Sequence, residues 1–404
     1  MDQGFRNYLT VTGGYWAFTI TDGAIRMLVV LYFHGLGYSP LQIAMLFLFY
    51  EFFGIVTNLV GGWLGARIGL NRCMHIGMLM QIGVLLMLTV PDAWLTVAYV
   101  MVAQAFSGIA KDLNKMSAKA GVKLFVPVQS DAKLFRWVAI LTGSKNALKG
   151  AGFFIGGALL AWLEFRGALF ALSTMLLLAL ICTWWLLPSG LGKTKMKAKF
   201  SQVFSKDPQI NWLSGARFFL FGARDIWFVV GLPVFLQSVL GWTFTQVGAF
   251  LALWVIGYGF IQGVAPKIIQ LSSSHAPGAK TLVVWAGMLS LLPIGIAMAL
   301  QQGWDAGAVL IVGLALFGIV FAMNSATHSY LIVSWSDHDK VSMNVGFYYM
   351  ANAGGRLAGT VLSGLIYQQH GLEGCLYWSA AFVLAATLAS VKLERMNRFL
   401  TQAQ

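Results

Sequence analysis

The sequence predicts an all-α integral membrane protein with twelve transmembrane helices in two pseudo-symmetric six-helix halves. Three observations predict this fold class: an apolar composition, twelve apolar stretches and an internal repeat. Hydrophobic residues make up 58% of the 404 residues and charged residues 10%, whereas soluble domains carry about 25% charged residues. A chain with so few charged side chains cannot cover a soluble surface, so many of its apolar side chains must face lipid.

Each predicted helix is an apolar stretch of about 20 residues, which is enough for one membrane crossing. The first six stretches lie at 8–35, 39–66, 73–90, 93–114, 136–162 and 167–187. The second six lie at 210–239, 243–266, 281–300, 306–330, 341–367 and 372–391. We therefore expect an N-terminal half at 1–187, a linker at 188–209 and a C-terminal half at 210–404. The linker is basic and should be solvated, because it holds Lys193, Lys195, Lys197, Lys199 and Lys206.

The distribution of the 27 lysines and arginines predicts the orientation in the membrane. With both termini in the cytosol, 20 of them fall on the cytosolic connections and tails, and only Arg166 falls on the opposite face. Positively charged loops stay in the cytosol, so this asymmetry predicts a multi-pass protein with both termini cytosolic. The bias also accounts for the net charge of +13, and we expect no nucleic-acid partner.

Two sequence repeats relate the halves. Leu36–Gln42 after the first span resembles Leu240–Gln246 after the seventh, and Asn146-Ala147 recurs as Asn352-Ala353. Paired six-helix repeats are typical of transporters that bind substrate near the membrane midplane, between the halves. Residues 62–72, from Gly62 to Arg72, resemble the loop signature of the major facilitator superfamily. The usual aspartate is Ala66 here, so the motif supports the architecture and says nothing about the substrate.

Nine charged residues lie inside the predicted spans and away from their ends, and each is a candidate functional residue because charge is costly in a bilayer. The bases are Arg26, Lys145, Lys149, Arg217, Arg224 and Arg356, and the acids are Asp22, Glu51 and Asp225. An excess of buried positive charge is best satisfied by an anion. We therefore expect a multiply anionic substrate.

Spacing along each helix suggests roles for these residues. Asp22 and Arg26 lie one turn apart, which is the geometry of an intrahelical ion pair, and Arg224 adjoins Asp225 in span seven. These pairs either neutralise each other or orient the bases. Arg217 shares a helix face with Arg224, and it either faces the substrate or anchors the helix at the interface.

Other bases have no acidic neighbour in their own span. Lys145 and Lys149 lie one turn apart in span five, so they either bind a phosphate-like group or extend to the cytosolic interface. Arg356 lies in the matching region of span eleven, and a guanidinium suits bidentate recognition of phosphate or carboxylate. The repeated Asn146 and Asn352 are further candidate substrate ligands.

Glu51 has no base one turn away on its helix. We expect this unpaired carboxyl group either to carry a coupling proton or to hydrogen-bond a neighbouring helix. Lys111 and Lys115 belong to a basic stripe at the end of span four, which contacts lipid phosphates or attracts the substrate. His328 in span ten is either a packing residue or a proton relay.

The cysteines Cys73, Cys182 and Cys375 are widely separated, so we expect no metal site and no cofactor. The spans contain no catalytic Ser/His/Asp set or metal-protease motif. The protein is therefore expected not to be an enzyme, and a membrane-embedded enzyme or lipid transferase stays a remote alternative.

Four stretches resemble the organoarsenical exporters of the major facilitator superfamily, and the likeness runs over nearly the whole chain. They are Tyr15–Gly23, Ser107–Lys115, Leu141–Gly150 and Phe221–Asp225. The resemblance implies a monomer in the bacterial cytoplasmic (inner) membrane that exports 1-arseno-3-phosphoglycerate by alternating access, coupled to protons. It also implies a functional partner, a cytosolic glyceraldehyde-3-phosphate dehydrogenase that makes this ester from arsenate. The alternative is a sugar-phosphate or other organic-anion exchanger.

Overall fold

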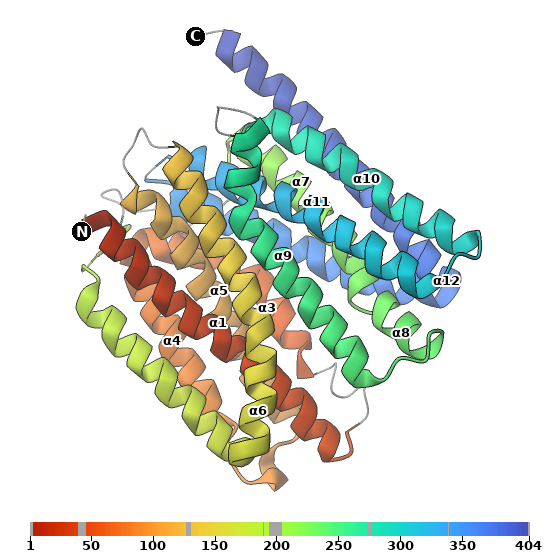
Figure 1. The fold of residues 1–404 in the computed structure, drawn as a ribbon. Helices are drawn as coiled ribbons and strands as arrows, with labels where there is room; N and C mark the ends of the chain where they lie inside the picture. Colours follow the sequence, from red (N-terminus) through yellow and green to blue (C-terminus); the bar gives the residue numbers. More distant parts are fainter. Residues whose placement is uncertain are drawn as a thin grey trace. The chain divides into compact units, whose positions relative to one another are not determined.

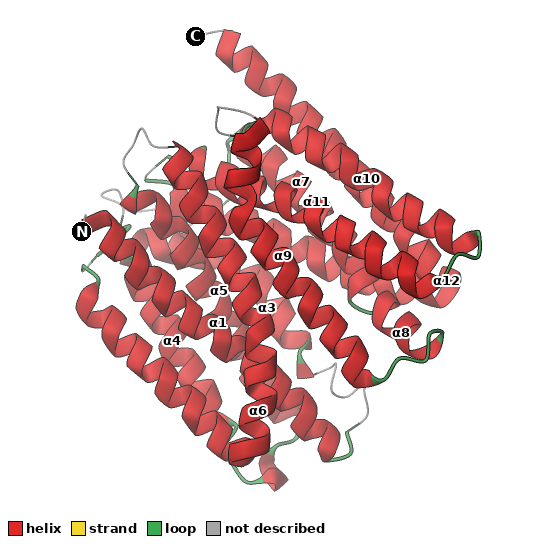
Figure 2. Cartoon of the chain, in the orientation of Figure 1, coloured by secondary structure: helices red, strands yellow, loops and turns green. Residues whose placement is uncertain are grey.

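The computed structural model describes residues 3–38, 46–126, 131–188, 190–193, 204–272, 277–337 and 339–402, and this part of the chain is helical, without strands (Figures 1 and 2). The elements are α1 (Gln3–Gly35), α3 (Leu48–Ile68), α4 (Leu70–Met87), the 3₁₀ turn η1 (Asp92–Trp94), α5 (Val97–Phe125), α6 (Asp131–Leu186), α7 (Pro208–Phe228), α8 (Gly231–Ser238), α9 (Phe244–Ser272), α10 (Ala279–Gln301), α11 (Ala306–Ser334) and α12 (Val341–Gln402). The predicted all-α class is confirmed.

Helices α6 and α12 each contain two predicted spans. Glu164 interrupts α6 with φ 57° and ψ −178°, and Gly371 interrupts α12 with φ 63° and ψ −163°. Glycine adopts such a conformation readily because it has no Cβ. Figure 1 shows the chain reversing direction within α6. The spans expected at 136–162, 167–187, 341–367 and 372–391 thus lie on either side of these two breaks.

The seventh predicted span, 210–239, is broken into α7 and α8. Pro233 explains the break, because proline cannot donate to the carbonyl group one turn earlier and its ring collides with that carbonyl. The Ser363 hydroxyl oxygen accepts hydrogen bonds from the backbone N–H groups of Val230 and Gly231 at 3.2 and 3.1 Å. This serine satisfies backbone donors that the interruption leaves outside the helix.

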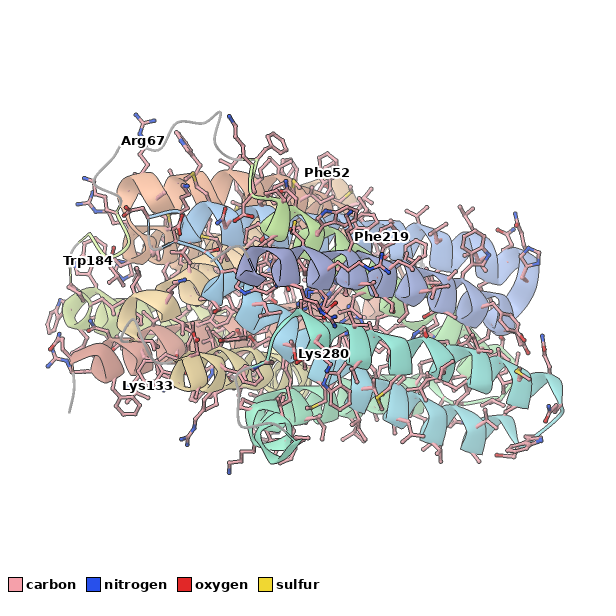
Figure 3. All side chains as sticks on the ribbon, turned by 90° about the horizontal axis from the view of Figure 1, so that it is seen from above. Phe52, Arg67, Lys133, Trp184, Phe219 and Lys280 are labelled. Atoms are coloured by element: carbon pink, nitrogen blue, oxygen red, sulfur yellow. The ribbon has the colours of Figure 1, made fainter. Side chains whose placement is uncertain are left out.

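Within the described residues, eight helical stretches are long and apolar enough to cross a membrane. Large apolar side chains also point outward from the helices, among them Phe52 of α3 at 50% and Trp184 of α6 at 61% exposed (Figure 3). In a bilayer such side chains contact lipid, so their exposure is expected.

The chain divides into two compact units. Unit 1 contains Met1–Leu134, Ser144–Phe204 and Ser336–Met350, and unit 2 contains Phe135–Gly143, Ser205–Trp335 and Ala351–Gln404. The main change of unit, after Phe204, falls in the expected linker. Lys195, Lys197 and Lys199 of that linker, and residues 39–42 of the first repeated turn, lie outside the described residues.

Each unit has its own apolar core. In unit 1, α5 packs against α1, α3 and α4, and one core cluster includes Phe33, Phe165 and Leu172. In unit 2, α11 packs against α9 and α10, and the core is rich in aromatic rings, including Trp227 and Phe317. The candidate functional residues lie on the helices that build these cores.

Candidate functional site

In unit 1, Asp22 of α1 pairs with Lys149 of α6. The Lys149 ammonium lies 2.9 Å from Asp22 Oδ2, and Asp22 is 4% exposed. The two helices meet at glycines: a Cβ added to Gly23 would lie 2.6 Å from the Lys149 carbonyl oxygen and 3.2 Å from the Gly152 Cα. This close approach brings the two charged side chains together.

The expected intrahelical pair between Asp22 and Arg26 is wrong. Asp22 is held by Lys149, and Arg26 lies 3.6 Å from Glu51 Oε1 on α3. Because the partners come from neighbouring helices, spacing along α1 could not identify them.

The prediction that Glu51 is unpaired is also wrong. Besides Arg26, the Lys111 ammonium lies 3.9 Å from its carboxylate. The same ammonium lies 3.7 Å from Asp112, and Lys115 lies 2.5 Å from Asp112. Arg26, Glu51, Lys111, Asp112 and Lys115 therefore form one chain of alternating charges across α1, α3 and α5.

The basic stripe on α5 is buried in unit 1, so the expected lipid contact is wrong for most of it. The side chains of Lys111 and Lys115 are each 15% exposed, and Lys119 is 2% exposed. Lys123 donates a hydrogen bond to the Ser336 carbonyl oxygen. Lys111, Lys115 and Lys123 thus contact protein groups, and helix α5 extends past its predicted end at residue 114.

Lys145 and Asn146 are adjacent in α6, and the Lys145 ammonium donates to the Asn146 side-chain oxygen at 3.2 Å. Ser144, one residue earlier, accepts from the Trp16 indole at 2.7 Å. This turn of α6 thus presents a lysine and an amide beside α1, one helical turn from Lys149.

In unit 2, Asp225 of α7 is fully buried between two arginines. Arg224 Nε donates to Asp225 Oδ1 at 2.7 Å, and Arg356 Nε of α12 donates to Oδ2 at 3.0 Å. The expected Arg224–Asp225 pair is confirmed. A Cβ on Gly359 would lie 3.0 Å from the Asp225 Cβ, so α7 and α12 also meet at a small residue.

Arg217 belongs to a second network of unit 2. Its Nε donates to Asn352 Oδ1 at 2.9 Å and its Nη1 to the Ser325 hydroxyl at 3.0 Å. Ser325 also accepts from Tyr258 at 3.0 Å and from Gln262 at 3.1 Å. Because Arg217 is 3% exposed, its alternative role as an interfacial anchor is wrong.

The ring of Phe221 joins these two groups of residues. The Arg217 guanidinium carbon lies 3.8 Å from the ring centroid and that of Arg224 lies 5.1 Å from it. The prediction that both arginines share a face of α7 is confirmed. His328 of α11 is 1% exposed.

Several residues that take part in these contacts are not among those predicted from the sequence. Asp112 lies beside Lys111 and three residues before Lys115, a spacing that identifies an acid between two bases. Ser325 belongs to a polar run in α11, Asn324 to Tyr330, that is buried throughout. Tyr50, whose hydroxyl donates to Asp22 Oδ1 at 2.5 Å, carried no signal in the sequence.

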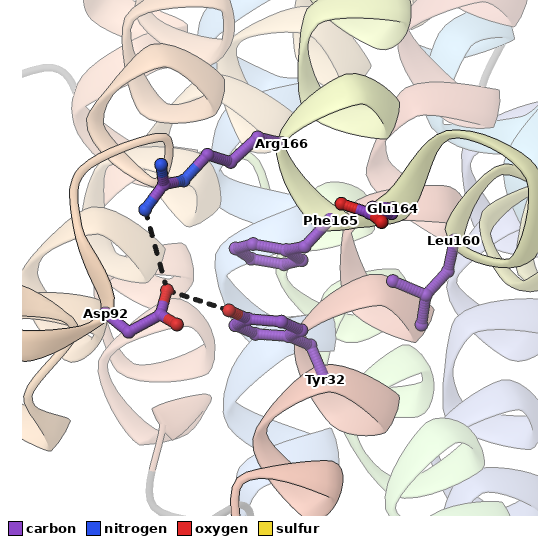
Figure 4. Close-up of a pocket in the computed structure, with 6 residues that line it drawn as sticks. All are labelled: Tyr32, Asp92, Leu160, Glu164, Phe165 and Arg166. Atoms are coloured by element: carbon purple, nitrogen blue, oxygen red, sulfur yellow. Dashed lines mark hydrogen bonds and ion pairs between the residues drawn. The ribbon is translucent and has the colours of Figure 1, made fainter.

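A cavity of about 430 Å³ lies at another part of unit 1, lined by Tyr32, Asp92, Leu160, Glu164, Phe165 and Arg166 (Figure 4). The rings of Tyr32 and Phe165 stack with centroids 3.9 Å apart. Asp92 accepts from the Tyr32 hydroxyl at 2.8 Å and lies 3.8 Å from Arg166. These contacts join the turns that follow α4 and interrupt α6.

A family model described as Major Facilitator Superfamily matches residues 11–329. The chain belongs to the major facilitator superfamily. It is therefore a multi-pass membrane transporter of the kind that carries small molecules across a bilayer. No curated protein sequence matches the chain.

Solved structures of other superfamily members share the fold. A bacterial homologue of the iron transporter ferroportin, in an outward-facing state, is 14% identical with a TM-score of 0.76, over 98% of this chain and 100% of the other. The human organic anion transporter MFSD10 (TETRAN) is 16% identical with a TM-score of 0.76, over 96% and 99%. The transporter FucP, in its outward conformation, is 11% identical with a TM-score of 0.74, over 96% and 98%.

Proposed function

We propose that this major facilitator exports an organic anion, and that the anion is 1-arseno-3-phosphoglycerate. The observation that supports this proposal is an excess of buried basic residues over acidic ones in the cluster of each unit. Unit 1 brings together four bases and three acids, and unit 2 three bases and one acid. Clusters with net positive charge inside a membrane protein favour an anionic ligand over a metal cation or a neutral sugar.

The resemblance to organoarsenical exporters supplies the identity of the anion. This ester carries a phosphate and an arsenate group, and both are tetrahedral oxyanions that lysine and arginine bind well. The human transporter MFSD10, which shares the fold, is an organic anion transporter, and this supports an organic anion as the substrate. Lys145, Lys149, Arg224 and Arg356 would bind the oxyanions, assisted by Asn146 and Asn352, while Asp22 and Asp225 orient the bases.

Export by alternating access, linked to a proton gradient, completes the proposal. The reason for assigning the proton to Glu51 no longer holds, because Glu51 pairs with Arg26 and Lys111. Cytosolic glyceraldehyde-3-phosphate dehydrogenase would supply the ester from arsenate, so the two proteins together would give arsenate resistance.

Arsenic speciation outside cells tests this function. Cells that lack arsenate efflux and express the chain together with the dehydrogenase should accumulate arsenate in the medium, released by breakdown of the exported ester. Cells that express either protein alone should not. Equal external arsenic with and without the dehydrogenase would exclude the ester as the substrate.

Two double variants, each of which removes two positive charges, test whether the buried clusters are needed for this export. Lys149→Ala with Arg356→Ala should abolish arsenate resistance, because one base is lost from each cluster. Lys340→Ala with Arg398→Ala also removes two positive charges, but at side chains that are 64% and 69% exposed, and should keep resistance. Undiminished resistance in the first pair, with normal membrane expression, would contradict the proposed sites.

A sugar-phosphate or other organic-anion exchanger is the second candidate, because the same bases would bind any phosphate ester. Vesicles that contain the purified chain separate the two. A proton gradient should drive flux of the anion if export is proton-coupled, whereas an exchanger responds to phosphate or a phosphate ester on the opposite side of the membrane.

A further inference from the structure

Three side-chain donors of unit 2 converge on the hydroxyl oxygen of Ser325 in α11. This oxygen accepts from Arg217 Nη1 of α7 at 3.0 Å, and from the Tyr258 hydroxyl and Gln262 Nε2 of α9 at 3.0 and 3.1 Å. A serine hydroxyl oxygen has two lone pairs, so it cannot accept from all three. If the Ser325 hydroxyl donates to Tyr258 instead, the proton of Tyr258 becomes the surplus donor. In both cases Arg217, Tyr258 and Gln262, the donor set of unit 2, carry one donor more than Ser325 accepts.

The donor set lies in a part of unit 2 where hydrogen-bonding capacity is incompletely used. Gln262 and Ser325 are 0% exposed. Asn324, next to Ser325, is equally buried, and among the described residues neither its amide nitrogen nor its amide oxygen has a hydrogen-bond partner. Buried polar groups in native proteins are nearly always hydrogen-bonded, so this region favours the binding of a further polar group.

Ser325 can turn away from the donor set without disrupting its helix. A serine hydroxyl in a helix can donate to the carbonyl oxygen four residues earlier, which belongs to Phe321 here. Thr327 of the same helix already makes such a bond, since its hydroxyl donates to the Met323 carbonyl oxygen at 3.0 Å. Once Ser325 has turned, the three donors face a shared acceptor position, and the oxygens of an oxyanion suit such a position because charged acceptors form the stronger hydrogen bonds.

Phe221 places the donor set beside the arginines of the proposed anion site. The guanidinium carbons of Arg217 and Arg224 lie 3.8 and 5.1 Å from its ring centroid, so their separation cannot exceed the sum of these two distances. Arg224 in turn shares Asp225 with Arg356. A phosphorus atom and a carboxyl carbon at opposite ends of a three-carbon phosphate ester lie about 5 Å apart, at about 1.5 Å per bond. One such molecule can therefore contact both guanidinium groups.

We propose that the donor set is a second oxyanion position, through which unit 2 selects three-carbon phosphate esters that carry another anionic group at the far end. The inference rests on the proposed function, because it takes Arg224 and Arg356 as ligands of the first oxyanion. The phosphate, with its three terminal oxygens, engages these two guanidinium groups. The donor set binds the group on carbon 1, which is the arsenate of the exported ester and a carboxylate in 3-phosphoglycerate. Ser325 is the acceptor of the set before the ligand binds.

Two probes that differ at one end measure this selection. 3-Phosphoglycerate has a phosphate and a carboxylate, whereas glycerol 3-phosphate has the same phosphate and a neutral hydroxyl group in place of the carboxylate. Calorimetric titration of the purified full-length chain should show that 3-phosphoglycerate binds more tightly by about 10–100-fold, the usual contribution of a charged hydrogen-bonded group. Arg217→Gln should reduce this ratio of affinities by about tenfold or more and leave the affinity for glycerol 3-phosphate unchanged.

A neutral donor of the set should have a smaller effect. Tyr258→Phe should reduce the ratio of affinities by about 2–10-fold, because a hydrogen bond from an uncharged donor contributes less. Arg398→Gln is the matched control, since the same substitution removes an equal charge at a side chain of unit 2 that is 69% exposed. It should leave the ratio unchanged. Both affinities are measured on one preparation, so a smaller folded fraction in a variant cancels from the ratio.

Ser325→Ala separates binding of the ligand from a purely structural role of this network. The variant removes the acceptor that competes with the ligand, so it should keep the preference for 3-phosphoglycerate. Equal binding of the two probes by the wild type, an unchanged ratio in Arg217→Gln, or the same loss of preference in Ser325→Ala would overturn the inference and leave the proposed anion function intact. Failure of the wild type to bind either probe would instead contradict the proposed function, and the inference with it.

Discussion

Asp22 and Asp225 each pair with a base on another helix. Asp22 pairs with Lys149 across α1 and α6, and Asp225 with Arg356 across α7 and α12. Burial of an isolated ion costs several kcal/mol, so each carboxylate depends on the bases around it. This dependence is strongest for Asp225, which is fully buried and is the shared counter-charge of two arginines.

Removing this carboxylate should therefore destabilise the fold. Asp225→Ala leaves Arg224 and Arg356 without their shared counter-charge, and we expect the free energy of unfolding to fall by about 3–5 kcal/mol. Asp337→Ala is the control, because Asp337 is 76% exposed beside Lys340 and an exposed pair contributes about 0–1 kcal/mol. Thermal or denaturant unfolding in detergent measures both, and equal effects would contradict the assigned burial.

At the scale of the helices, the apolar stretches of the sequence predict correctly which helices exist and in what order. They predict less accurately where each helix ends. The end of α5 depends on tertiary packing, because unit 1 buries Lys115 and Lys119 beyond the predicted end of that span. The end of α7 has a local cause, because Pro233 divides span seven. The pairing of Asp22 was missed for a related reason. The contact between Gly23 and Gly152 determines which faces of α1 and α6 meet. The spacing of residues along a single helix does not predict this contact.

The contact between α1 and α6 provides a test on a single helix. Gly23→Val would place a branched side chain against the Lys149 carbonyl, which lies 2.6 Å from an added Cβ. Overpacking of this kind costs about 1–3 kcal/mol, and we expect it to separate Asp22 from Lys149 and abolish anion transport. Gly13→Val, also on α1, has no atom within 4 Å of its added Cβ. Equal transport by both variants would exclude a role for this contact.

At the scale of the molecule, the two units repeat one arrangement. In each, an aspartate on the first helix pairs with a base on the fifth predicted span, beside a close approach of small residues. Asp225 follows Asp22 by 203 positions and Arg356 follows Lys149 by 207, close to the offsets of the sequence repeat. The base of the repeated pair is a lysine in unit 1 and an arginine in unit 2.

The orientation of the whole chain is predicted by its basic residues and can be tested at the two ends of α11. Replacing the native cysteines by serine and introducing Gln302→Cys or Asp337→Cys places one exposed thiol before or after this helix. A helix of 29 residues is about 44 Å long. With the basic connections in the cytosol, a membrane-impermeant thiol reagent should label residue 302 in intact cells and residue 337 only after permeabilisation. The reverse pattern would place the termini outside and turn the proposed export into uptake.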